Sequence, residues 1–287
     1  MHKKLFITDF DGTLLKDDKT IAKEDINALK GLKEKGIVRC IATGRSIYSF
    51  SKILKTFPFD SLLDFPIDYL IFSTGAGIMD FNTGKTIKSF SLSESDVINI
   101  ADYFEKSKLD YMVHKPIPDT NYFVHRSFGK DNQDFKDRIN LYKEYSSLID
   151  SVNNLQGFGE STEVLSIVPC ESIYAKPEMI EKIKQDLCMF SVIIATSPLD
   201  KQSLWVEVFN KNVSKSKAAY FLSQKLLIER KNVFSIGNDH NDYDLLEWSG
   251  KGFVVENALK ELKKTFKQVP SNNNCGVSAV IEKLLKT

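Results

Sequence analysis

The chain has 287 residues, of which 42% are hydrophobic and 27% charged, values typical of a soluble globular protein with one large domain or two ordinary ones. Its 39 basic and 38 acidic side chains give a formal net charge of +1, which excludes a global attraction to nucleic acid or to an acidic membrane surface. No window approaches the roughly 18 apolar residues of a membrane span, and no signal-peptide pattern opens the chain, so we expect a cytoplasmic protein that binds neither nucleic acid nor membranes.

The first predicted element is an apolar strand, Leu5–Thr8, that delivers Asp9 and Asp11 into an Asp-Gly turn. Alternate side chains share a face on an extended strand, so the two carboxylates should project together where the strand stops. Such a pair suits a divalent cation, because Mg²⁺ is commonly held by one or two carboxylates together with substrate phosphate. The alternative is an ordinary surface turn, since Asp-Gly beside apolar residues is also a hairpin signal.

Helix and strand patterns alternate after this turn. We predict a helix over 21–35, a strand over 37–42, a helix over 47–55 and a strand over 69–72. Such alternation is typical of a parallel sheet with right-handed crossovers, in which ligands lie beyond the carboxyl ends of the strands. The segment Thr43-Gly44-Arg45 follows the second strand and can therefore lie beside Asp9 and Asp11.

Residues 81–210 break the alternation and predict an inserted α+β domain. The Asn82-Thr83-Gly84 segment is a hairpin signal between two strand-like runs. Within the insert we predict helices over 93–106 and 177–187 and strands over 164–168, 192–195 and 204–209.

The α/β pattern resumes after the insert. Ser214 is a candidate N-cap for a helix that runs to about Leu227. A strand over 232–236 then ends in Gly237-Asn238-Asp239-His240-Asn241-Asp242. We therefore predict one core domain built from residues 1–80 and 211–287, with the insert between its two parts.

These segments resemble the signature motifs of the haloacid dehalogenase (HAD) superfamily, whose members are mostly phosphatases. Asp9-Phe10-Asp11-Gly12-Thr13-Leu14 is similar to the first motif. The other three are matched by Thr43-Gly44-Arg45, by Lys215 and by Gly237-Asn238-x-x-Asn241-Asp242. Their order, with the insert between motifs two and three, most resembles the Cof-type sugar-phosphatase branch. The resemblance implies a three-layer, Rossmann-like α/β core with a mostly parallel sheet and an inserted α+β C2-type (C2B) cap.

The resemblance also implies an activity and a set of roles. The activity would be Mg²⁺-dependent hydrolysis of small phosphorylated metabolites, chiefly sugar phosphates, through an aspartyl-phosphate. Asp9 would be the nucleophile, and Asp11 the acid that protonates the leaving oxygen and then the base that activates water. The resemblance assigns phosphate binding to Phe10, Thr43, Gly44, Lys215 and Asn241, weaker substrate contacts to Arg45 and Asn257, and the metal to Asp9, Asp11, Asn238 and Asp242.

Two of these assignments have competitors. Asn238 stands where the family usually has an aspartate, so metal binding should be weaker, and Asp239 could serve by a small shift in register. Lys217 competes with Lys215, although Val213-Ser214-Lys215 resembles the family's third motif.

The insert and the alternative functions stay open at this stage. His114, Tyr122, His125, Arg126 and Trp205 are loose candidates for substrate contacts from the cap, and plain cap packing is the commoner fate of such aromatic residues. A phosphomutase similar to phosphomannomutase uses the same nucleophile, and a regulatory binding protein would fit a weakened metal site. Neither the physiological substrate nor the oligomeric state can be read from the sequence.

Overall fold

A computed structural model describes residues 3–59, 64–129 and 131–286. These residues pack as two compact units. The first unit consists of the segment that ends at Arg45, of Ser49–Ser89 and of the segment that begins at Ser214. The second unit consists of Ser46–Tyr48 and Phe90–Val213. Within the described ranges, no helix is long and apolar enough to cross a membrane.

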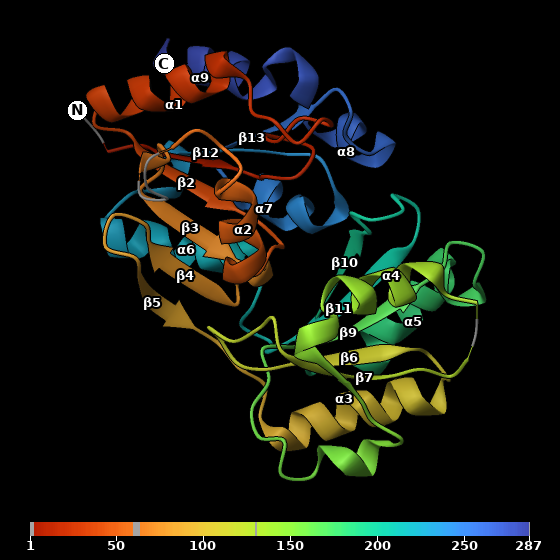
Figure 1. The fold of residues 1–287 in the computed structure, drawn as a ribbon. Helices are drawn as coiled ribbons and strands as arrows, with labels where there is room; N and C mark the ends of the chain where they lie inside the picture. The colour runs from red at the N-terminus through yellow and green to blue at the C-terminus, as the bar shows by residue number, and fades with distance from the viewer. Residues whose placement is uncertain (1–2, 60–63, 130, 287) are drawn as a thin grey trace. The chain divides into compact units, whose positions relative to one another are not determined.

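The first unit is built on an eight-stranded sheet in the order β14-β13-β12-β1-β2-β3-β4-β5 (Figure 1). Its strands are β1 (Leu5–Thr8), β2 (Val38–Ala42), β3 (Tyr69–Phe72), β4 (Gly77–Asp80), β5 (Lys85–Ser89), β12 (Val233–Gly237), β13 (Lys251–Val255) and β14 (Lys267–Val269). The strands from β14 to β3 run parallel, and β4 and β5 continue the sheet antiparallel. Strand β1 therefore lies inside the sheet, with Leu5 opposite Val233 of β12 and Val38 of β2.

Helices cover both faces of this sheet, as Figure 1 shows. They are α1 (Lys23–Glu34), α2 (Ile47–Leu54), α6 (Lys215–Leu226), α7 (Tyr243–Trp248), α8 (Lys260–Thr265) and α9 (Gly276–Leu285). Helices α1 and α9 pack against each other, whereas α6 and α7 contribute Leu222 and Leu245 to the cluster that buries Leu5 of β1. All four residues of β1 are buried, as expected for a strand covered on both sides. The predicted three-layer core with a mostly parallel sheet is confirmed.

The second unit contains a six-stranded sheet in the order β10-β11-β9-β6-β7-β8. Its elements are α3 (Glu94–Lys106), β6 (Tyr111–His114), β7 (Phe123–Arg126), α4 (Gln133–Leu141), β8 (Ser146–Leu148), β9 (Glu163–Val168), α5 (Pro177–Asp186), β10 (Ser191–Thr196) and β11 (Leu204–Phe209). Apolar residues of α3 and α5, such as Ile100 and Ile183, form one cluster with the sheet, and Phe135 of α4 belongs to another with Leu165 of β9. The unit has the α+β character expected of the insert.

The boundaries of this unit differ from the expected 81 and 210. Strand β5 stays with the first unit because it pairs with β4, which itself pairs with β3. The second unit therefore begins its long segment at Phe90, and it ends at Val213 just before the N-cap of α6.

A largely buried ion pair joins β2 to the residue that precedes β3. Arg39 is 2% exposed, and its guanidinium donates to both Asp68 oxygens, with Nε to Oδ2 at 2.9 Å and Nη2 to Oδ1 at 2.6 Å. The backbone N–H of Arg39 also donates to Asp68 Oδ2 at 2.9 Å. The pair thus fixes the approach of the third parallel strand to the second.

Replacing Asp68 by asparagine should lower the free energy of unfolding of the protein by about 3 kcal/mol, because it leaves the buried Arg39 cation without a charged partner. Urea denaturation followed by circular dichroism measures this change. The matched control is Glu181→Gln, which breaks the exposed Glu181–Lys184 pair and should change stability by less than about 0.5 kcal/mol. Equal effects of the two variants would contradict the role given to Arg39.

Candidate active site

Loops from four neighbouring strands meet at the carboxyl edge of the core sheet. Each loop directly follows a parallel strand of the first unit. The loops begin at Asp9 after β1, at Thr43 after β2, at Ser73 after β3 and at Asn238 after β12. The predicted motifs one, two and four are therefore neighbours because their strands are neighbours.

Lys215 lies at the centre of this edge, at the first position of α6. It is fully buried, and its Nζ donates to Asp9 Oδ1 at 2.7 Å and to Asp242 Oδ1 at 2.6 Å. A third acceptor, Asn241 Oδ1, lies 3.4 Å from the same nitrogen. Ser214 forms the N-cap of α6, as expected, by accepting from the backbone N–H of Lys217. The cap sets the start of the helix so that Lys215 points inward, whereas Lys217 is exposed.

The charges in this cluster do not balance. Burial raises the pKa of Asp9 to about 7, and the Asp242 carboxylate adds to the rise, against the lowering effect of Lys215. Burial on its own would lower the pKa of Lys215, but the Asp242 and Asp9 carboxylates outweigh it and hold that pKa above its ordinary value. One buried ammonium is thus shared by two carboxylates, and a further cation beside Asp9 would be stabilised there.

Asp242 organises the loop after β12. While Oδ1 accepts from Lys215, its Oδ2 accepts from the backbone N–H groups of Asn238 at 2.8 Å and Asp239 at 3.1 Å. Asp239 in turn caps the short 3₁₀ turn His240–Asp242 in a reciprocal capping box. Both Asp242 oxygens are therefore engaged by groups of the chain itself.

The Asn238 side chain lies against the first motif. In the amide orientation that satisfies its neighbours, its Nδ2 donates to Asp9 Oδ2 at 3.1 Å, to the main-chain oxygen of Asp11 at 3.1 Å and to Thr13 Oγ1 at 2.9 Å. Gly12 allows this approach, since a Cβ built there would lie 2.8 Å from the other terminal atom of the Asn238 amide and its φ is +73°. The amide thus occupies the point where a carboxylate oxygen and a carbonyl oxygen converge.

Asp11 is held by Arg45 in a bidentate ion pair. Nε and Nη2 of Arg45 each donate to one Asp11 oxygen at 2.7 Å. The guanidinium also donates to Ser49 Oγ and lies 5.8 Å from the centroid of the Phe10 ring. Arg45, expected as a weaker substrate contact, therefore contacts the second carboxylate of the first motif.

The second motif forms a tight turn beside the fourth. Thr43 is 1% exposed, and its Oγ1 accepts from the backbone N–H of Arg45 at 3.0 Å. A Cβ built on Gly44 would lie 3.5 Å from Thr74 Oγ1 and 3.7 Å from Asn241 Nδ2. Gly44 thus lies beside both the loop after β3 and the fourth motif.

The site also contains two threonines, Thr13 and Thr74, that the motif assignments left out. Thr13 contacts the Asn238 amide. Thr74 is fully buried with φ at +54°, a region that a β-branched residue rarely adopts and that is often found near functional sites. The run of small residues Ser73–Gly77 at a strand end was the available signal for Thr74, and position within the first motif was the signal for Thr13.

Asn257 supports the site from outside. Its Nδ2 donates to the Gly12 carbonyl at 2.7 Å, and its Oδ1 accepts from the backbone N–H of Asn272 at 3.0 Å. The residue is therefore engaged in holding the Asp-Gly turn, and a contact with substrate stays a prediction.

The cap candidates differ in their surroundings within the second unit. His114 is 1% exposed, its Nδ1 lies 2.8 Å from the Thr120 carbonyl oxygen, and burial lowers its pKa to about 3. Trp205 Nε1 donates to Asp134 Oδ2 at 2.9 Å. Arg126 lies over the Phe128 ring, burial lowers the pKa of the half-buried His125, and Tyr122 is exposed. His114 and Trp205 are thus held by contacts within the second unit, and a substrate contact from any of the five stays a prediction.

The oxygen atoms at this edge fit a hard cation better than a transition metal. Asp9 Oδ2 and the Asp11 carbonyl oxygen converge on one point with the Asn238 amide, and Mg²⁺ takes such oxygen ligands. Among the residues that the structure describes, no group of three or more His, Cys, Asp or Glu could hold a metal ion. The donor set therefore depends on a main-chain oxygen and on the amide of Asn238.

Comparison with known proteins places the chain in a family. Residues 6–281 match the family model of haloacid dehalogenase-like hydrolases. The chain is 27% identical over 99% of its length to a Streptococcus pyogenes protein that is named a phosphatase without a stated substrate, and covers 98% of that protein. It is 25% identical to a Bacillus subtilis 5-amino-6-(5-phospho-D-ribitylamino)uracil phosphatase, with 98% of each chain covered.

Solved structures agree on the fold. The phosphatase BT1666 from Bacteroides thetaiotaomicron superimposes with a TM-score of 0.77 at 16% identity, with 100% of this chain and 96% of that one covered. The subclass IIB sugar phosphatase BT4131 gives a TM-score of 0.74 at 17% identity, with coverages of 99% and 100%. The predicted family is confirmed: the chain belongs to the haloacid dehalogenase-like hydrolases.

Proposed function

We propose that this hydrolase is a Mg²⁺-dependent phosphatase that releases phosphate from small phosphorylated metabolites, sugar phosphates first among them. The observation that carries the proposal is the buried contact of Lys215 with Asp9 at 2.7 Å. It joins a candidate nucleophile to a fixed positive charge at the carboxyl edge of a parallel sheet, where ligands bind in such folds. The names of the relatives support the phosphatase activity, and the sugar phosphatase among the solved structures supports the substrate class.

Asp9 has the surroundings that a carboxylate nucleophile needs. A phosphate monoester is anionic, and two like charges 4 Å apart repel by about 4 kcal/mol at an effective dielectric of 20. The Lys215 ammonium beside Asp9 offsets this repulsion. In the proposed first step, an Asp9 oxygen attacks phosphorus, the bond from phosphorus to the leaving oxygen breaks, and an aspartyl-phosphate forms.

Asp11 would complete both halves of the reaction. It would give a proton to the leaving oxygen, and then take a proton from the water that attacks the aspartyl-phosphate, which returns Asp9 as a free carboxylate. Arg45 engages each Asp11 oxygen with one hydrogen bond, and a carboxylate oxygen has a second lone pair that can take the proton. Arg45 would thereby hold Asp11 in place while it exchanges protons.

Backbone and side-chain donors would hold the phosphate oxygens. We assign this role to the N–H groups around Phe10 and Gly44, to the Thr43 hydroxyl and to Asn241. Gly44 lies beside Asn241 and Thr74, so donors from three loops would act at one place.

We assign the metal to Asp9, to the main-chain oxygen of Asp11 and to Asn238. When bound, Mg²⁺ would supply the second positive charge that lets phosphate approach Asp9. A half-turn of the Asn238 amide would present its oxygen at the point where its nitrogen now donates to Asp9 and Asp11. We keep Asp242 as a candidate for a direct or water-mediated contact with the metal, although Lys215 and two backbone N–H groups already engage its oxygens.

Asp9→Asn should reduce kcat by at least about 1,000-fold, because the amide keeps the shape of the side chain but is not a nucleophile. Phosphate release from a panel of sugar and other metabolite phosphates, with and without Mg²⁺, measures this loss. The exposed Asp18 provides the matched control, and Asp18→Asn should keep kcat within about twofold. Turnover by the wild type only with a bisphosphate activator would identify a mutase instead, and no turnover at all would point to a binding protein.

Asn238→Asp should lower the Mg²⁺ concentration for half-maximal thermal stabilisation about tenfold, because it adds a negative charge beside Asp9 and a harder oxygen ligand. Differential scanning fluorimetry across a Mg²⁺ titration measures this without any substrate. Asn212→Asp adds the same charge at an exposed position in the second unit and should leave the Mg²⁺ midpoint unchanged. An unchanged midpoint in Asn238→Asp would remove Asn238 from the metal site.

A further inference from the structure

A pocket lies at the opposite edge of the core sheet, where strands β12, β13 and β14 begin. It has a volume of about 360 Å³ and is lined by Phe234, Lys251, Gly252, Phe253, Lys267 and Lys283. Lys251 and Lys267 are the first residues of β13 and β14, and Lys283 comes from α9. The catalytic candidates Asp9 and Asn238 follow the other ends of β1 and β12. The pocket is therefore separate from the candidate active site.

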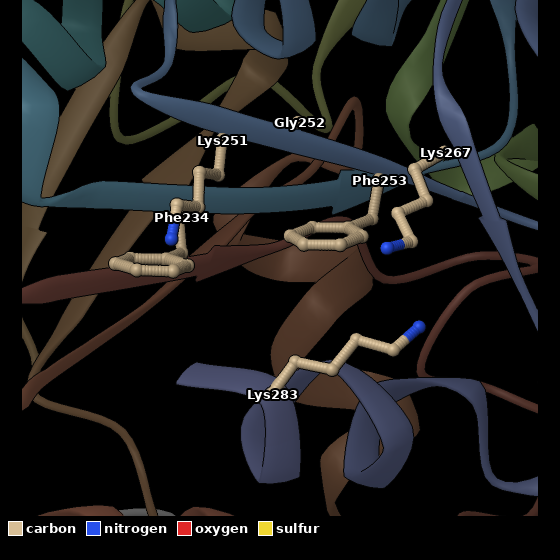
Figure 2. A pocket seen from close by; sticks show the side chains of 6 residues that line it. All are labelled: Phe234, Lys251, Gly252, Phe253, Lys267 and Lys283. Atoms are coloured by element: carbon tan, nitrogen blue, oxygen red, sulfur yellow. The ribbon is translucent and has the colours of Figure 1, made fainter. Parts of the chain in front are cut away.

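The pocket combines an apolar floor with ammonium groups around it. Figure 2 shows the phenyl rings of Phe234 and Phe253 side by side on the strands, with lysine side chains on more than one side of them. Lys251 Nζ lies 5.2 Å from the centroid of the Phe234 ring, and Lys283 Nζ lies 5.6 Å from that of Phe253. These contacts hold the Lys251 and Lys283 ammonium groups over the two rings.

The charge in this pocket is uncompensated within the described part of the chain. Its lining contains three lysines and no acidic side chain, and none of the three forms an ion pair with a described residue. Lys4 adds a fourth ammonium 5.9 Å from the Phe234 ring. Residues 251–287 carry seven lysines against three glutamates, although the net charge of the whole chain is only +1. Three of these seven lysines line the pocket.

We propose that this pocket binds the polyphosphate chain of a small molecule. Lysine is a point-charge donor for phosphate, and three ammonium groups around one hollow match several linked phosphates better than a single carboxylate. The volume falls within the range of about 300–1,000 Å³ found for small-molecule sites, which favours a small ligand. The polyphosphate can belong to an inorganic chain or to a nucleoside triphosphate.

The test is titration of the full-length protein with inorganic tripolyphosphate in Mg²⁺-free buffer, followed by ¹⁵N NMR. The amides of Gly252 and Phe253 should shift, and they report on this pocket independently of Gly12 and Gly44 at the candidate active site. The variant Lys251→Gln/Lys267→Gln/Lys283→Gln should bind at least tenfold more weakly at this pocket. Raising the salt concentration should weaken binding by the wild type.

The matched control removes the same charge elsewhere in the first unit. Lys52, Lys85 and Lys225 are exposed residues of α2, β5 and α6, and their triple change to glutamine should leave the affinity at Gly252 within about twofold. An equal loss in the two triple variants would show general attraction only and would overturn the proposal. Unchanged chemical shifts of the Gly252 and Phe253 amides in the wild type would also overturn it. The lysines would then serve only to prevent another strand from pairing with the edge strand β14.

Two further ligands distinguish the source of the phosphates. Adenosine triphosphate binding more tightly than tripolyphosphate, with adenosine alone not binding, would support a nucleotide ligand. Equal affinities for the two polyphosphates would support recognition of the phosphate chain alone. Binding of adenosine as tightly as adenosine triphosphate would overturn the proposal, because the lysines would then contribute nothing.

Discussion

The contact on which the catalytic edge depends is the buried ammonium of Lys215 between Asp9 and Asp242. A lysine removed from water is stable only with charged partners, so its position ties α6 to the end of β1 and to the loop after β12. The same carboxylates gain from its charge, and removal of Lys215 would leave both of them buried without a charged partner. Local stability and the placement of the nucleophile therefore rest on one set of bonds.

The parts of this arrangement that the sequence predicted are those governed by local rules. A run such as Leu5–Thr8 is mostly apolar because helices cover both faces of its sheet, and the alternation of such runs with helices predicts a parallel sheet. Because parallel strands end at one edge, the sequence predicted that Asp9 and Thr43 can be neighbours, and the resemblance between motifs added Asn238 to them. Resemblance between motifs then pointed to the family.

The features that the sequence did not predict depend on contacts between distant segments, which no local pattern encodes. The pairing of Asp11 with Arg45 and the bond from Asn257 to Gly12 are set by rotamers and by close approach of separate loops. The sequence did not predict Thr74 for another reason. Its left-handed backbone is imposed by surrounding packing and not by the preference of threonine. The boundary at Phe90 likewise reflects the pairing of β5 with β4. The alternation of helix and strand patterns, from which residue 81 was predicted, stops before β5.

The interior position of β1 has a consequence for biosynthesis. Its neighbour β2 follows closely along the chain, but its other neighbour, β12, is translated only after the whole second unit. A nascent chain therefore carries β1 with one hydrogen-bonding edge open while Phe90–Val213 emerges and can already pack around its own sheet. Unpaired strand edges are sites of aggregation, so the ribosome-bound protein is most vulnerable during synthesis of its own cap.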